Sequence, residues 1–142
     1  ELERVFEDFR DGASRAGGGD AAGRSLRQAI ADLDAGRVDE AVRAAQKAVR
    51  SPRHRFEAAV LLARVHRDRG KTHEAIEWFE RAAQAHAPNA GAGRDLLYEL
   101  GHLLAEAGET ARALAVFLEL QADAPDYRDV GAEIERLTQK TA

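Results

Sequence analysis

The chain has 142 residues, of which 25 are acidic and 21 basic, so its formal net charge at pH 7 is −4. It contains no cysteine, which excludes disulfide bonds, zinc–thiolate sites and thiol nucleophiles. No apolar run approaches the ~20 residues that a membrane-spanning helix needs, so we expect a cytoplasmic protein without direct membrane insertion.

Alanine, leucine, glutamate and arginine dominate the composition, whereas aromatic residues make up only 6%. These abundant residues favour helices, and the β-branched and aromatic residues that favour strands are sparse. The composition therefore predicts an all-α protein.

The first predicted element is a short amphipathic helix followed by a glycine-rich tether, together covering residues 1–20. Leu2, Val5, Phe6 and Phe9 follow the spacing of one face of a helix. The glycine triplet at 17–19 and its polar neighbours are typical of a flexible connection. We expect this helix to bury its apolar face against something, and assign residues 21–142 to a separate domain.

Three helical hairpins follow, predicted at about residues 22–51, 55–87 and 94–123. Three stretches at their turns repeat in register: DAGRVDEA at 34–41, DRGKTHEA at 68–75 and EAGETARA at 106–113. The first two copies are 34 residues apart and the last two 38 apart. A period near 34, with a glycine between two helical patterns, is typical of stacked hairpins in an α-solenoid.

The four additional residues in the second interval fall in PNAGAG, at residues 88–93. Because insertions in repeat arrays map to loops, we expect this connection to bulge at the surface. A last amphipathic helix at about 126–139 places Val130, Ile134 and Leu137 on one side and charges on the other, which predicts a cap for the end of the stack.

The repeated residues resemble the tetratricopeptide repeat. In the second hairpin the resemblance lies in Gly70 at the turn and in Ala75, Phe79 and Ala82 along the second helix. The first hairpin departs from the pattern at Ala45, where the family usually has an aromatic residue. The opening VFEDF and the closing PDYRDV also look like segments of bacterial multi-domain proteins that carry such arrays.

The resemblance implies a concave groove lined by the first helix of each hairpin, in which partner peptides or helices lie. Arg64 and Arg67 would form a cationic centre beside an apolar surface, favouring an acidic or amphipathic partner. The implied partner-binding residues are Leu26, Ile30, Leu33, Val60, Arg64, Arg67, Tyr98 and His102.

No motif in the sequence indicates chemistry. The five histidines form no pair at i, i+3 or i, i+4 spacing, so no helix presents paired histidine metal ligands. The glycine triplet lacks the lysine of a phosphate-binding loop, and the carboxylates lie on polar helix faces. We therefore predict no enzyme, no metal site and no cofactor. The net negative charge and the absence of clustered aromatic residues argue against nucleic acid.

Two functions fit these patterns. The first is a non-catalytic interaction scaffold that binds a protein or peptide in the groove. The alternative is a structural self-association domain, in which the helix at residues 2–9 docks on its own array or on that of a neighbouring molecule.

Overall fold

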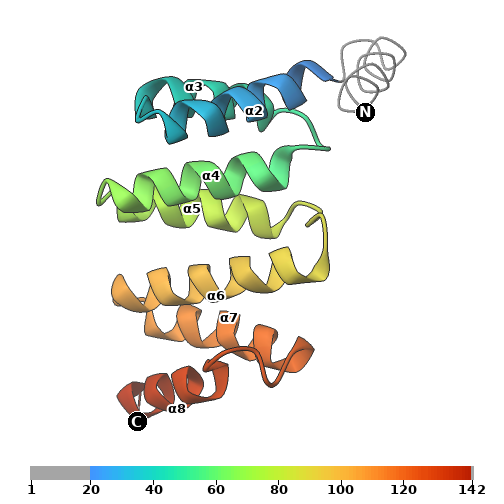
Figure 1. Cartoon of the computed structure of the whole chain (residues 1–142). Helices are drawn as coiled ribbons and strands as arrows, with labels where there is room; N and C mark the ends of the chain where they lie inside the picture. Colours follow the sequence, from blue (N-terminus) through green and yellow to red (C-terminus); the bar gives the residue numbers. More distant parts are fainter. Residues whose placement is uncertain (1–19, 142) are drawn as a thin grey trace.

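The computed structural model describes residues 20–141, and the predicted helix at 2–9 lies outside the described residues. The described chain folds into seven α-helices (Figure 1). They are α2 (Asp20–Asp34), α3 (Val38–Ala48), α4 (Arg55–Asp68), α5 (Thr72–Ala83), α6 (Ala90–Glu106), α7 (Thr110–Asp123) and α8 (Val130–Thr141). None of these helices is long and apolar enough to cross a membrane.

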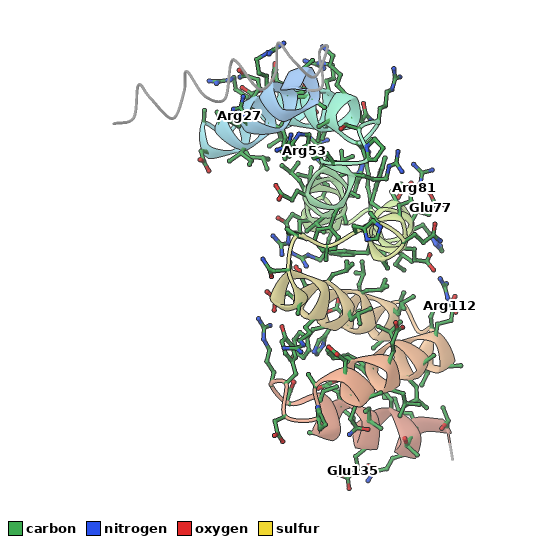
Figure 2. All side chains as sticks on the ribbon, turned by 90° about the vertical axis from the view of Figure 1, so that its right-hand side faces the viewer. Arg27, Arg53, Glu77, Arg81, Arg112 and Glu135 are labelled. Atoms are coloured by element: carbon green, nitrogen blue, oxygen red, sulfur yellow. The ribbon has the colours of Figure 1, made fainter. Side chains whose placement is uncertain are left out.

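The helices form three antiparallel hairpins, α2/α3, α4/α5 and α6/α7, stacked one above the other with α8 packed on α7 (Figure 1). Each helix packs mainly against its neighbours in the sequence, as in a solenoid. Figure 2 shows Glu77, Arg81 and Arg112 projecting from α5 and α7 on one side of the stack. The first helices of the hairpins lie on the other side. The all-α solenoid predicted from the repeats is confirmed.

One glycine turn joins the two helices of each hairpin. Gly36, Gly70 and Gly108 have φ of 80°, 75° and 82°, in the left-handed region that favours glycine. In all three turns the glycine N–H and the next N–H donate to carbonyl groups in the last turn of the preceding helix. The repeated sequence thus encodes a repeated helix C-cap.

The core runs between the hairpins as a ribbon. Ala41, Ala75 and Ala113, one from each repeated stretch, are fully buried and allow close helix contact. Phe79 and Phe117 are the largest fully buried side chains. They belong to one apolar cluster that extends through the second and third hairpins to α8, whereas the first hairpin contributes to two small clusters built largely from alanine.

The prediction of a surface bulge at residues 88–93 is wrong. The helix α6 begins at Ala90, so most of the additional residues form an extra first turn of that helix. Asn89 caps it, because its side-chain oxygen accepts a hydrogen bond of 2.8 Å from the N–H of Ala92.

The capping helix begins later than predicted, at Val130 instead of about residue 126. Tyr127 and Arg128 lie in the preceding turn, where Arg128 has φ of 43° and so cannot belong to a right-handed helix. Val130 and Leu137 are buried as predicted, while Glu135 points away at the end of the stack (Figure 2).

Candidate functional site: an acid-rimmed groove

The first helices of the three hairpins line a pocket of about 530 Å³, here called the groove pocket. Side chains from α2, α4 and α6 converge there because the hairpins stack with their first helices on one side. Five of the eight residues predicted for the groove line it: Leu26, Ile30, Leu33, Val60 and Arg64.

The floor of the groove pocket is apolar. Leu26, Val60 and Leu96 are nearly buried, with 5%, 8% and 3% of their surface exposed. Ile30 is 47% exposed and is one of the two large apolar side chains that remain most exposed within residues 20–141. An aliphatic side chain left half in water at the edge of a pocket would gain free energy on being covered.

The rim of the groove pocket is acidic. Five carboxylate residues line it against one guanidinium, that of Arg64: Asp34, Glu57, Asp68, Asp95 and Glu99. Asp34 and Glu57 are exposed, so their charges face solvent or a bound partner.

Arg64 and Arg67 do not form the open cationic centre that the sequence suggested. Both donate to Glu99: Arg64 Nε and Nη2 lie 2.9 and 2.7 Å from its two oxygens, and Arg67 Nη1 lies 3.1 Å from Oε1. The hydrogen bond with Glu99 raises the pKa of Arg64 above its ordinary value. One carboxylate from α6 therefore pairs with the guanidinium groups of both Arg64 and Arg67 on α4 and reduces the net charge of the three side chains to +1.

The other three predicted groove residues, Arg67, Tyr98 and His102, line a neighbouring pocket of about 300 Å³, here called the cap pocket. Beside it, the Tyr98 hydroxyl donates to Asp129 Oδ1 at 2.6 Å, and the Tyr127 hydroxyl donates to Asp95. Arg128 lies over both tyrosine rings, 4.8 and 5.2 Å from their centroids. This polar cluster joins α6 to the turn before α8.

The residues that could hold a metal ion are His102, Asp129 and Glu133, whose donor atoms all lie within 4.8 Å of one another. The cluster contains no histidine pair, since it combines one histidine of α6 with two carboxylates about 30 residues further along the chain. The signal that could have pointed to it is the i, i+4 spacing of Asp129 and Glu133 at the start of the cap.

Sequence reasoning also missed Phe56, Glu57 and Leu96 as groove-pocket residues. Phe56 could have been found, since it lies four residues before Val60 and eight before Arg64 on the same face of α4.

Comparisons with known proteins agree with the geometry. A tetratricopeptide-repeat family model matches residues 26–90. A solved structure titled "Crystal structure of MamA" superposes with a TM-score of 0.69 at 18% identity, over 99% of this chain and 82% of that chain. A second structure, "Crystal structure of MamA protein", gives 0.68 at 21% identity, over 97% and 76%. No curated protein matches significantly. Residues 26–90 therefore match the tetratricopeptide repeat, and the solved structures share the solenoid fold of the three capped hairpins.

Proposed function

We propose that this protein is a non-catalytic interaction scaffold that binds an amphipathic helix or peptide with a basic face in the groove pocket. The observation that carries the proposal is the combination of an apolar floor with an acidic rim on the side formed by α2, α4 and α6. A tetratricopeptide-repeat fold supports the general role of a protein–protein interaction scaffold.

The size of the groove pocket suits side chains of a partner. At about 530 Å³ it falls within the ~300–1,000 Å³ range of protein binding pockets. An amphipathic helix lays apolar residues at i, i+3, i+4 and i+7 spacing into such a groove and keeps its polar face outside. Ile30 and Leu33, one turn apart on α2, would contact these apolar residues.

Charge selects the kind of partner. Glu99, Asp68 and Asp95 each have an arginine partner within the protein. Asp34 and Glu57 are exposed at the rim, so lysine and arginine residues flanking the apolar stripe of a partner would meet opposite charge there. Such complementarity accelerates association and disfavours partners of the wrong charge.

The same charge argues against the N-terminal segment as the occupant. Residues 1–10 carry four acidic residues, Glu1, Glu3, Glu7 and Asp8, and two arginines. A segment with a net charge of −2 would be repelled by the rim, which favours an external basic partner over self-association.

The proposal is tested by titrating the full chain with three fluorescent peptides and measuring Kd. The first has leucine at i, i+3, i+4 and i+7 positions and lysine elsewhere, the second replaces each lysine by glutamate, and the third is residues 1–10 of this protein. We expect the lysine peptide to bind most tightly and its affinity to fall as salt is added. Equal or tighter binding of the glutamate peptide would refute the acidic-rim proposal, and tighter binding of the third would favour self-association.

A matched pair of variants locates the binding surface. Ile30 and Leu118 are both 47% exposed, but only Ile30 lines the groove pocket. Ile30→Ser should weaken binding of the lysine peptide, whereas Leu118→Ser on α7 should leave it unchanged. Equal loss in both variants would place binding outside the groove pocket.

A further inference from the structure

The imidazole of His102 has an unsatisfied polar atom. Its Nε2 is buried and has no hydrogen-bond partner among the described residues. The ring is held by edge contacts with Tyr98 and Phe117, whose centroids lie 4.4 and 5.3 Å away. A buried nitrogen without a partner costs ~1–3 kcal/mol, and such a group in a native structure calls for a ligand or another explanation.

Two carboxylates stand beside this imidazole. Asp129 immediately precedes α8, and Glu133 lies in the first turn of that helix. One oxygen from each and one ring nitrogen of His102 lie within 4.8 Å of one another. Three donors from two separate elements therefore converge on one point between α6 and α8.

Both carboxylates are held in place through one oxygen each. Tyr98 donates to Oδ1 of Asp129 at 2.6 Å, and Arg136 Nη2 lies 2.6 Å from Oε2 of Glu133. The other oxygens, Oδ2 of Asp129 and Oε1 of Glu133, accept no hydrogen bond within residues 20–141. Partners of this kind, which orient ligating groups, are typical of metal sites.

We propose that His102, Asp129 and Glu133 bind a divalent transition-metal ion such as Zn²⁺, and that the ion fastens the capping helix α8 to α6. One imidazole nitrogen and two carboxylate oxygens suit Zn²⁺ and its first-row neighbours, and suit Ca²⁺ less well. Ligand atoms around a tetrahedral Zn²⁺ lie roughly 3.4 Å apart, given bond lengths near 2.0–2.2 Å. The donor atoms lie within 4.8 Å of one another, so bound-state spacing calls for a shift of about 1 Å; Asp129 is exposed, and the side chain of Glu133 is 13% exposed.

Three protein ligands leave a coordination position for water or for a donor from a partner. Asp129 is exposed, so the proposed site lies at the surface. The proposed site is independent of the groove pocket, because none of its three ligands lines that pocket.

The test titrates the full chain with ZnCl₂ and, separately, CoCl₂. Calorimetry gives Kd, the visible absorption of bound Co²⁺ reports the ligand geometry, and the thermal midpoint reports stabilisation by an ion that binds only the folded state. We expect saturable binding of one ion, a higher midpoint and slower amide exchange in α8.

The decisive variants are Glu133→Gln, which keeps the shape of the side chain, and His102→Ala. Removing one of three ligands should weaken Kd at least ~10-fold, since even loss of a second-shell partner costs about 10–100-fold. His86→Ala, which changes an exposed histidine outside the cluster, is the control and should leave Kd unchanged. Unchanged Kd in Glu133→Gln and His102→Ala, or loss in His86→Ala alone, would overturn the proposal.

Discussion

Gly101 lies where α6 crosses the ring of Phe117, and a Cβ atom at this position would meet ring carbons at 2.7–2.9 Å. Phe117 is fully buried and cannot retreat without disturbing the main apolar cluster. Gly101→Ala should therefore lower the free energy of unfolding by ~1–3 kcal/mol, the usual effect of overpacking. The matched control is Gly93→Ala in the same helix, where the nearest contact would be an ordinary 3.6 Å. It should raise stability by ~0.5–1 kcal/mol through helix propensity. Urea unfolding of both variants tests this prediction. Equal changes in the free energy of unfolding would contradict the close contact between position 101 and the Phe117 ring.

Asp32, His66 and Leu104 occupy equivalent positions, the last-turn residues whose carbonyl groups accept the second hydrogen bond of each glycine turn. Asp32 is buried and accepts hydrogen bonds from Gln28 and Arg37, both at 3.0 Å. Leu104 is buried among apolar residues. His66 satisfies neither pattern, because its buried Nδ1 has no partner within the described chain.

His66→Leu should raise the free energy of unfolding by ~1 kcal/mol, because it removes an unsatisfied buried nitrogen. Burial, with Lys71 nearby, lowers the pKa of His66 below 6.5. The folded state thus prefers the neutral imidazole. The free energy of unfolding of the parent chain is therefore undiminished by His66 protonation above pH 6.5, and it decreases as the pH falls below 6.5. Urea unfolding between pH 7 and pH 5 should show a smaller decline for the variant, and an unchanged decline would rule out His66 as its source.

At the scale of elements, the junction between α6 and the turn before α8 depends on two tyrosine–aspartate pairs. The hydrogen bond to Asp129 raises the pKa of Tyr98 to about 12. Burial, together with the hydrogen bond to Asp95, raises the pKa of Tyr127 to about 12. Both values exceed the ordinary 10.0, so the folded state retains two protons that the unfolded chain releases.

The stability from these pairs is therefore complete below pH 10 and is lost as the pH rises through about 12. Tyr98→Phe should be less stable than the parent chain at pH 7, by ~1 kcal/mol for a lost hydrogen bond, but should decline less in alkali. The chain has only two tyrosines, so the ultraviolet absorbance of tyrosinate follows both directly. A midpoint of the tyrosinate titration near pH 10 would contradict the hydrogen bonds of the two tyrosines with Asp129 and Asp95.

At the scale of the whole molecule, the groove combines charged side chains from three hairpins. Glu99 forms ion pairs with Arg64 and Arg67, so its own negative charge is neutralised within the protein. The double variant Arg64→Gln, Arg67→Gln should expose the carboxylate of Glu99 to a partner. One exposed charge contributes about 0.2–1 kcal/mol, so binding of the lysine peptide should tighten roughly 1.4- to 5-fold. An unchanged thermal midpoint would show an intact fold, and weaker binding of that peptide would contradict an acidic groove.

The free energy of local unfolding should also differ between the hairpins of the array. The first hairpin has Ala45 where the others have Phe79 and Phe117, and its core consists of two small clusters. Less apolar surface buried means less stabilisation per hairpin, and a linear array can open locally. Native-state amide exchange should therefore show lower opening free energies in α2 and α3 than in α6 and α7. Equal protection throughout would indicate a single cooperative unit.

The sequence by itself determined the hairpins, their turns and their packing faces. These features depend on short-range physics: a glycine that can adopt positive φ, a 3.6-residue apolar period, and an alanine small enough for close helix contact. Even Asn89 is a local N-cap signal, although the assumption that insertions form loops concealed it.

Only the tertiary structure decided which side chains meet between hairpins. The pairing of Glu99 with Arg64 and Arg67 joins residues 32 and 35 positions apart, and the convergence of Asp129 and Glu133 on His102 depends on how the cap turns over α6. The repeat fixes which face of each helix points inward, but the rotation and offset between successive hairpins determine which inward residues touch. Those quantities follow from packing summed over the whole stack, and no short segment of sequence encodes them.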